Sequence, residues 1–177
     1  MITKAQSLDN FIDKSLYEKN KGYYQRKMEF GRRGDFITSP GISKLFSEMI
    51  AIWVVSFWEN LNKPKKINLV ELGAGNGELI EVLINTLNKL EIVKDKFKFF
   101  IFEKSVSLKK LQKKKFSKSV KWLDNFDKLP NSPTIFLANE FFDALPIKQF
   151  IKINEDWYEN YVSVSYTHLT LPTSQLV

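Results

Sequence analysis

The feature that most constrains this chain is a short apolar run that breaks into three glycines at alternating positions. The run begins at Ile67 and leads into Gly73, Gly75 and Gly77, after which apolar residues recur at helical spacing. A strand, a glycine turn and a helix in this order form the first unit of a doubly wound α/β sheet, whose ligands bind at the carboxyl ends of the strands. Glycine suits this turn because the turn requires unusual φ values and brings a ligand close to the bare backbone.

The spacing of the glycines separates two kinds of cofactor site. A dinucleotide fingerprint, G-x-G-x-x-G, requires its third glycine at position 78, where this chain has Glu78. The observed G-x-G-x-G follows an acidic residue, Glu71, and resembles the first motif of class I S-adenosylmethionine-dependent methyltransferases. Alone, a glycine-rich turn after a strand is equally well explained as a simple tight turn. The neighbouring segments are therefore needed to distinguish a cofactor site from such a turn.

Two amphipathic helices are predicted before the glycine turn. The first carries apolar residues from Leu8 to Leu16, and the second presents an apolar stripe from Ile42 to Trp58. Ser39 suits the N-cap of the second helix, with Pro40 at its first position. Its i, i+3, i+4, i+7 stripe predicts core packing rather than an aromatic binding platform.

The excess of positive charge is concentrated in one segment. The formal net charge is +7, and much of it lies in the lysine run between Lys104 and Lys121. Leu108, Leu111 and Phe116 supply a buried stripe there while the lysine heads extend to solvent. A solvated helix face is therefore favoured over a surface that follows phosphates, and nucleic acid is not the expected partner.

Cysteine and membrane signals are both missing from the sequence. Without cysteine there is neither a disulfide framework nor a thiolate metal site, and no metal is expected. The amino terminus has no apolar signal core, and no segment approaches the length of a membrane span. The expected location is the cytoplasm of a bacterium, or the mitochondrial matrix of a eukaryote.

The last fourteen residues differ in character from the rest. Residues 164–177 contain no charged residue and hold the only histidine, His168. They resemble the in-frame translation of a transposon adapter used for sequencing libraries, which predicts an artefactual tail; an ordinary edge strand is the alternative. A chain without this tail has no histidine for a catalytic triad or a metal site, and we expect the natural chain to continue beyond Ser163.

Carboxylates and amides follow the next predicted strands. A second strand over 98–102 places Glu103 at its carboxyl end, where such a group binds ribose hydroxyls; a surface glutamate is the alternative. A third strand over 120–122 leads to Asp124 and Asn125. Either residue could hydrogen-bond the edge of an adenine, and a plain polar turn is the equally good alternative.

A fourth, fully apolar strand is predicted over 134–138, and it is followed by Asn139, Glu140 and Asp143. Parallel strands end at the same sheet edge, so these groups are expected beside the glycine turn. The alternative is the start of a helix with Asn139 as its N-cap. Residues 149–153 and 157–162 then flank a polar turn and predict a β-hairpin.

Three segments together resemble the MidA-type methyltransferases. They are Gly34-Asp-Phe-Ile-Thr-Ser-Pro40, Leu69-Val-Glu-Leu-Gly-Ala-Gly-Asn-Gly77 and Ala138-Asn-Glu-Phe-Phe-Asp-Ala-Leu-Pro-Ile147. That family includes a mitochondrial complex I assembly factor that methylates an arginine. The likeness runs from about residue 8 to about residue 162, and the third segment is the specific one. The family's proteins are roughly twice as long, and where they tend to carry a glutamate after Ser-Pro this chain has Gly41.

The resemblance implies a fold and its division. The expected fold is a doubly wound, Rossmann-like class I methyltransferase sheet that is truncated after its fourth strand and a β-hairpin, with an N-terminal helical extension. The corresponding division is 1–62 for the extension and motif loop, 63–163 for the S-adenosylmethionine-binding part, and 164–177 for the tail.

The resemblance also implies roles for the residues. S-adenosylmethionine is the cofactor, and the partner is a protein carrying an arginine, possibly a complex I subunit. Glu140 and Asp143 are the expected catalytic residues, with Asn139 as a positioning amide. The expected cofactor-binding residues are Glu71, Gly73, Gly75, Gly77, Glu103 and Asp124. Two alternatives stay open: another acceptor such as RNA, and a non-catalytic assembly module that has kept the fold.

Overall fold

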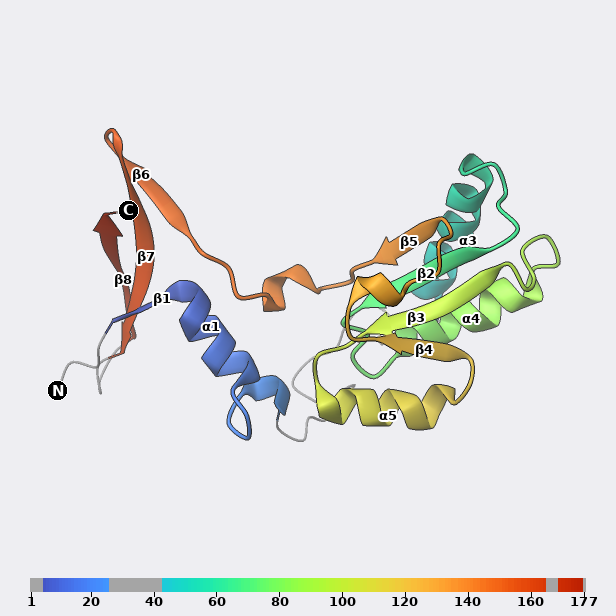
Figure 1. Cartoon of the computed structure of the whole chain (residues 1–177), viewed down its shortest axis with the longest axis horizontal. Coiled ribbons are helices and arrows are strands. Elements are labelled where there is room, and N and C mark those ends of the chain that lie inside the picture. The colour runs from blue at the N-terminus through green and yellow to red at the C-terminus, as the bar shows by residue number, and fades with distance from the viewer. Residues whose placement is uncertain (1–4, 26–42, 165–168, 177) are drawn as a thin grey trace. The chain divides into compact units, whose positions relative to one another are not determined.

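The computed structural model describes residues 5–25, 43–164 and 169–176 (Figure 1). The chain forms two compact units, each with its own sheet. One unit combines Met1–Arg26 with Phe142–Val177, and the other is the continuous segment Lys27–Phe141. The continuous segment contains the glycine turn and is called the sheet unit below; the other is called the terminal unit.

The sheet unit is built on four parallel strands. These are β2 (Ile67–Leu72), β3 (Phe97–Phe102), β4 (Val120–Leu123) and β5 (Thr134–Leu137). Their spatial order is β4-β3-β2-β5, so the chain moves outward from β2 to β4 and then returns to the opposite side of β2. This reversal creates the switch point at which doubly wound sheets bind ligands. The predicted Rossmann-like α/β sheet is confirmed.

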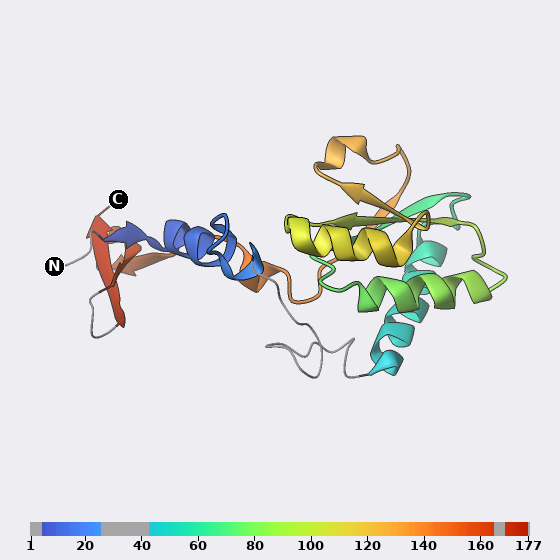
Figure 2. The same ribbon diagram turned by 90° about the horizontal axis from the view of Figure 1, so that it is seen from below.

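In the described part of the sheet unit, three helices supply the core on one face of this sheet. They are α3 (Lys44–Asn60), α4 (Glu78–Lys89) and α5 (Val106–Phe116). Figure 2 shows α3 and α4 together on one side of the sheet. Alternate strand residues face the helices, as the period of two in a strand requires. The buried strand residues of this core are Ile67, Leu69, Phe97, Phe99, Ile101, Val120, Ile135 and Leu137.

The packing of α3 corrects one expectation. Ala51 and Val54 are fully buried in the core, but Leu45 is 65% exposed and Met49 is 61% exposed. The prediction that the whole apolar stripe packs into the core is therefore wrong. The helix is apolar on most of its circumference, so periodicity alone does not tell which side meets the sheet. The exposed apolar residues of α3 are Leu45, Met49, Ile52, Trp53 and Phe57.

The second face of the parallel sheet has a much smaller core. Among the residues that the structure describes, its buried members are Val70, Phe100 and Leu123. Among the described residues of the sheet unit, the connection from β4 to β5 contributes just a single short 3-10 turn, η2 (Phe126–Lys128). Phe126 contacts the rings of Phe102 and Phe136, with ring centroids 4.9 and 5.5 Å apart. Phe126 and Phe136 are both nearly half exposed, so this aromatic cluster stays at the surface.

The terminal unit is built on an antiparallel sheet. Its spatial order is β1-β7-β6, with β8 also paired to β7. The predicted hairpin is confirmed, because β6 and β7 pair around a turn at residues 154–155. The elements are β1 (Gln6–Ser7), α1 (Leu8–Tyr17), η1 (Tyr23–Gln25), η3 (Phe142–Ala144), β6 (Phe150–Ile153), β7 (Asp156–Val164) and β8 (Leu169–Leu176).

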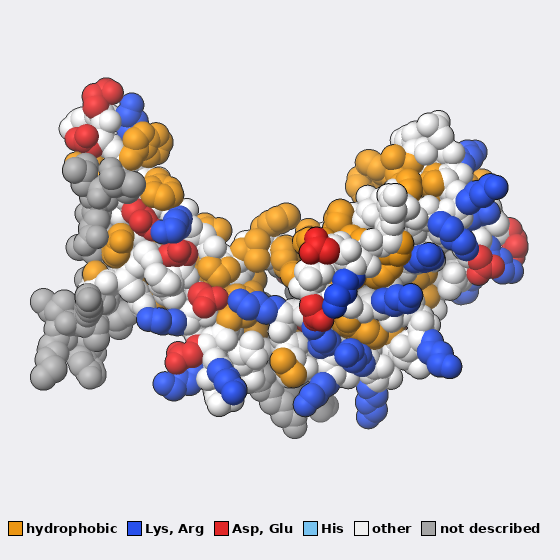
Figure 3. All heavy atoms as spheres, viewed as in Figure 1, with side chains coloured by type: hydrophobic (Ala, Val, Ile, Leu, Met, Phe, Trp, Pro, Cys, Tyr) orange, Lys and Arg blue, Asp and Glu red, His pale blue; other side chains and the backbone are white. Residues whose placement is uncertain are grey.

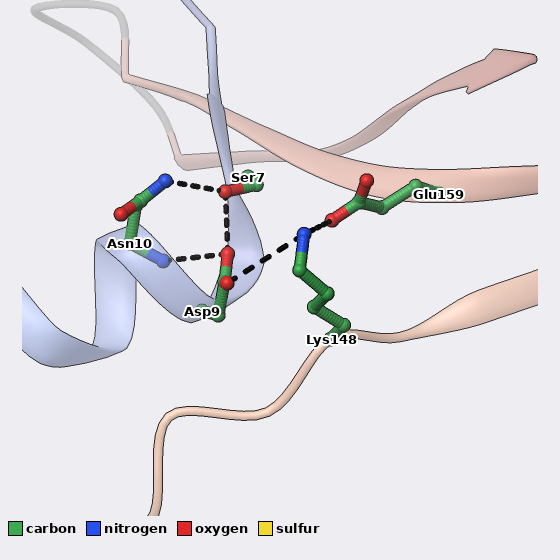
Figure 4. Close-up of polar contacts among 5 residues, drawn as sticks. All are labelled: Ser7, Asp9, Asn10, Lys148 and Glu159. Atoms are coloured by element: carbon green, nitrogen blue, oxygen red, sulfur yellow. Dashed lines mark hydrogen bonds and ion pairs between the residues drawn. The ribbon is translucent and has the colours of Figure 1, made fainter. Parts of the chain in front are cut away.

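Lys148 forms ion pairs with both α1 and β7 within the terminal unit (Figure 4). Lys148 Nζ lies 2.8 Å from Glu159 Oε1 on β7 and 3.7 Å from Asp9 Oδ2 in the first turn of α1. Asp9 is itself held locally, because it accepts hydrogen bonds from the Ser7 hydroxyl and from the backbone N–H of Asn10. The Ser7 hydrogen bond lowers the pKa of Asp9, and Glu159 raises the pKa of Lys148.

Strand β8 lies in the segment that the sequence marks as an artefactual tail. It pairs with β7 from Tyr158 opposite Leu176 to Val164 opposite Leu169. The register shifts between Tyr161 and Ser163, as expected where an edge strand contains a proline, here Pro172. Backbone pairing is open to almost any sequence, so the origin of the tail stays a prediction. The division at residues 62 and 163 also stays a prediction.

Candidate functional site

The glycine turn sits at the switch point of the parallel sheet. Gly73, Gly75 and Gly77 have φ values of +65°, +54° and +78°, in the left-handed region that other residues avoid. Gly73 N–H donates to Phe102 O at the end of β3, over 2.9 Å. The turn is thereby attached to the neighbouring strand, and its backbone is held at the carboxyl edge of the sheet.

Gly77 is the N-cap of α4 and packs against α5. A Cβ at Gly77 would lie 2.5 Å from Cε2 of Phe116, a separation that real structures do not tolerate. Glycine has no side chain that could cap the helix, and the first-turn N–H of Ile80 instead meets the carboxyl group of Glu71. Position 77 therefore needs glycine for its backbone angle and for the close approach of α5.

The glycine turn also meets the segment that follows β5. A Cβ added at Gly73 would lie 2.8 Å from Cδ2 of Phe141. Phe141 belongs to the Ala138–Ile147 motif, which is far from Gly73 in the sequence. Two of the three motifs that carry the family resemblance are therefore packed together, as the parallel order of β2 and β5 predicts.

Glu71 is buried beneath the turn and is 4% exposed. Burial is the main cause that raises its pKa to about 8, and the nearby charge of Glu103 raises it further, against the N–H of Ile80 and the charge of Lys115. The carboxyl is therefore mostly protonated at neutral pH. Among the described residues, its Oε2 has no hydrogen-bond partner. Glu71 was predicted to bind the cofactor, and that role stays a prediction.

Glu103 follows β3 directly and is 8% exposed. Ser105 N–H donates to its Oε1 over 2.9 Å, and Gln112 Nε2 donates to its Oε2 over 3.1 Å. Burial raises the pKa of Glu103, while hydrogen bonds from Ser105, from Gln112 and from the backbone of Lys104, together with the charge of Lys109, oppose the rise. A carboxylate offers about four acceptor positions, so these three protein donors leave capacity for about one further donor. That capacity suits a ribose hydroxyl.

Gln112 was missed by the sequence predictions. It is fully buried, on the same face of α5 as Leu108 and Phe116. The available signal was a single uncharged polar residue four positions from each of these apolar residues, inside a lysine run. A glutamine on the apolar stripe of a helix must find buried partners, whereas the lysines around it mark only the solvent face of the helix.

Asp124 follows β4 and stays at the surface. Lys109 Nζ lies 2.8 Å from Asp124 Oδ1, and this hydrogen bond is the main cause that lowers the pKa of Asp124. Lys109 also acts on Glu103, so the carboxylates after β3 and β4 share one cation. Asn125 is exposed and is the N-cap residue of η2. The adenine role of Asp124 stays a prediction.

The three predicted catalytic residues follow β5. Asn139 is half-buried, and Glu140 is exposed with a left-handed φ of +50°. Asp143 is exposed in η3 and belongs to the terminal unit. The helix that Asn139 could have capped does not form. The first helical turn after β5 is η3, which begins at Phe142. The Gly34–Pro40 segment, Gly41 and His168 lie outside the described residues.

Comparison with known families supports the prediction of a methyltransferase from the motifs. A family model described as S-adenosyl-L-methionine-dependent methyltransferase, Methyltransf_28, matches residues 49–176. A COG1565 superfamily member from Burkholderia thailandensis, solved bound to S-adenosyl-homocysteine, shares the fold with a TM-score of 0.76 and 25% sequence identity. The similarity covers 97% of this chain and 46% of that protein.

Curated relatives carry a more specific name. The mitochondrial protein arginine methyltransferase NDUFAF7 of Xenopus laevis is 30% identical over 89% of this chain and 42% of its own length. The homologue of Caenorhabditis elegans is 33% identical over 93% of this chain and 43% of its own length. The chain therefore spans less than half the length of the curated relatives that it matches. No helix in the described part of the chain is long and apolar enough to cross a membrane.

Proposed function

The chain belongs to the family of S-adenosyl-L-methionine-dependent methyltransferases, and on that premise we propose that it binds S-adenosylmethionine at the carboxyl ends of β2 and β3. The transferred methyl group goes to an arginine of a protein. The observation that carries the cofactor assignment is Glu103: a nearly buried carboxyl, held by Ser105 and Gln112, at the strand end next to the glycine turn.

The residues at this edge fit the chemistry of the cofactor. The left-handed glycines leave bare backbone for the methionine part of the cofactor, and Glu103 keeps acceptor capacity for a ribose hydroxyl. The unpartnered Oε2 of Glu71 is a second buried polar atom that a ligand could satisfy. When bound, the cofactor supplies a methyl group activated by a sulfonium. The protein has to hold donor and acceptor in line and exclude water.

The acceptor assignment rests on the names of the relatives and on the residues after β5. An arginine guanidinium is cationic and a poor nucleophile, so nearby carboxylates can orient it and stabilise the charge that develops. Glu140 and Asp143 are the carboxylates of this segment, and Asn139 supplies a positioning amide. The relatives are named protein arginine methyltransferases, which supports a protein arginine as acceptor. A complex I subunit is the partner that the family resemblance implies.

The lysines of α5 do not favour RNA as the acceptor. Figure 3 shows lysine side chains gathered over the sheet unit, but part of this charge is neutralised within the chain. Lys109 pairs with Asp124, and Lys115 Nζ lies 2.7 Å from Glu81 Oε2. Ion pairs of this kind reduce the attraction for phosphates. A protein arginine remains the better supported acceptor.

The cellular location is also part of the proposal. We place the protein in the cytoplasm if its source is a bacterium and in the mitochondrial matrix if its source is a eukaryote. The mitochondrial relatives support the second case. Fractionation of the source cells, with antibody against the chain, tests the location directly.

Calorimetric titration with S-adenosyl-homocysteine tests the cofactor site. We expect the chain to bind, and Glu103→Ala to weaken the affinity by about ten- to a hundred-fold, the loss that removing hydrogen bonds to a charged group produces. Glu91→Ala is the matched control, since Glu91 is exposed in the same unit and pairs only with Lys94 among the ion pairs described. Equal affinity of the Glu103 and Glu91 variants would contradict the assignment.

A further inference from the structure

A single buried amide connects three elements of the sheet unit. Gln112 Nε2 on α5 donates to Gly75 O over 2.8 Å and to Glu103 Oε2 over 3.1 Å. Its Oε1 accepts a hydrogen bond from Trp122 Nε1 on β4 over 2.9 Å. Both amide N–H groups and the carbonyl oxygen are thereby used, in a side chain with no exposed surface.

The indole of Trp122 determines which way the amide points. An indole N–H is only a donor, so it requires the oxygen of the glutamine amide. The NH2 group must then face Gly75 O and Glu103, which are both acceptors. A rotated amide would place a donor against the indole N–H and an oxygen against two acceptors. The orientation is therefore fixed by the partners, and only this one satisfies all four groups.

Packing alone does not explain a glutamine at this position. Leu108 and Phe116, one turn away on either side, already anchor α5 with buried side chains. A leucine or methionine at position 112 would add to the same apolar face without the desolvation of an amide. The amide is useful only for the groups that it contacts, which are the glycine turn and the carboxyl of Glu103.

We propose that Gln112 is a positioning residue of the cofactor site, oriented by Trp122, which fixes the glycine turn and the Glu103 carboxylate relative to each other. The proposal rests on the proposed binding of S-adenosylmethionine at this edge. Gln112 holds the backbone of the turn through Gly75 and holds one carboxylate oxygen of Glu103, while Ser105 holds the other. The carboxylate then presents its remaining lone pairs in one direction, before any ligand arrives.

The test compares Gln112→Met with Lys110→Met in the whole chain. Methionine keeps the length and helix propensity at both positions, but only the first change removes the hydrogen bonds. We expect Gln112→Met to weaken binding of S-adenosyl-homocysteine about ten-fold, measured by calorimetry well below the unfolding temperature, and Lys110→Met to leave it unchanged. Trp122→Phe should weaken binding in the same direction, because the amide loses the partner that orients it.

A second readout needs no ligand. The hydrogen bond from Gln112 lowers the pKa of Glu103, so Gln112→Met should raise that pKa, as followed by carbon NMR of the carboxyl. The titratable groups that act on the same carboxyl, Glu71 and Lys109, are unchanged in this variant. A residue that served only to pack α5 would shift the unfolding temperature without moving this titration.

The outcomes separate the inference from the proposed function. If the unchanged chain does not bind S-adenosyl-homocysteine, the cofactor assignment fails, and the titration of Glu103 still decides whether Gln112 positions that carboxyl. If the unchanged chain binds and Gln112→Met binds equally well, the positioning role is overturned while the cofactor site stands. An unchanged pKa of Glu103 in Gln112→Met overturns it as well.

Discussion

Phe141 occupies the space that a side chain at Gly73 would need. The Cβ that Gly73 lacks would lie 2.8 Å from Cδ2 of Phe141, and the φ of +65° at Gly73 disfavours any other residue independently of that contact. The contact joins the turn after β2 to the segment after β5. The proposed cofactor turn and the start of the proposed acceptor segment are therefore one packed structure.

Substitution of Gly73 should disturb both segments. Gly73→Ala is expected to lower the free energy of unfolding by about 1–3 kcal/mol, from the left-handed backbone and the contact with the Phe141 ring. Affinity for S-adenosyl-homocysteine should fall with it. The double variant Gly73→Ala with Phe141→Leu should recover the part caused by the contact, as measured by urea unfolding. No recovery would mean that the backbone angle alone carries the cost.

Glu71 should make the stability depend on pH. Its carboxyl has a pKa of about 8 in the folded chain against an ordinary value of 4.5, so between these pH values the folded state binds the extra proton. The free energy of unfolding should therefore fall as the pH rises through this window, by up to about 1.4 kcal/mol per pH unit for this one group. Glu71→Gln should remove this dependence. The free energy of unfolding of the variant should therefore rise relative to that of the unchanged chain between pH 5 and pH 8.

The measurement is urea unfolding at pH 5 and pH 8 of the unchanged chain, Glu71→Gln and the exposed control Glu91→Gln. Other carboxyls contribute equally to all three chains, so the difference between variants isolates Glu71. The same pH dependence in Glu71→Gln and the unchanged chain would mean that Glu71 is ionised when buried.

The carboxylates after β5 should affect turnover rather than cofactor binding. Glu140→Ala is expected to lower the rate of methyl transfer to an arginine peptide by about a hundred-fold, the scale of losing one preorganised electrostatic contact. Its affinity for S-adenosyl-homocysteine should stay close to that of the unchanged chain, whereas Glu103→Ala should lose affinity. Equal loss of cofactor affinity in both variants would contradict this division of roles.

The two faces of the parallel sheet should differ sharply in their sensitivity to truncation. Leu69 is completely buried on the helix-covered face, and Leu69→Ala should cost about 2–5 kcal/mol of unfolding free energy. Phe136 lies on the other face and is 47% exposed, so Phe136→Ala should cost less than about 1 kcal/mol. Similar losses at both positions in denaturant unfolding would show that the second face is packed as tightly as the first.

The fold was predictable where a local sequence pattern agreed with the general rule that ligands bind at the carboxyl ends of parallel strands. The run from Ile67 through the three glycines into a helix, and the polar residues at later strand ends, predicted the parallel sheet and its switch point. The resemblance to the MidA-type family, built on three short segments, is confirmed by the family match. Each of these inferences used residues whose role depends on chain order and backbone geometry.

The remaining features depend on contacts that periodicity does not specify. The prediction that the whole apolar stripe of α3 packs into the core was wrong, because Met49 and Trp53 are exposed although they are as apolar as the residues that are buried. Gln112 was missed because its partners, Gly75, Glu103 and Trp122, lie on three other segments of the chain. The raised pKa of Glu71 follows from burial, which a glutamate in a sequence does not reveal.

The division of the chain also sets an order of folding. All of the sheet unit lies in one continuous segment, whereas β1 and β7 must pair Gln6 with Val162 across that whole segment. Closing a long loop costs conformational entropy before its contacts are gained, and folding the intervening segment first reduces that loss. The parallel sheet can therefore form while the chain is still being synthesised. The ladder between β1 and β7 cannot form until the residues of β7 have been synthesised.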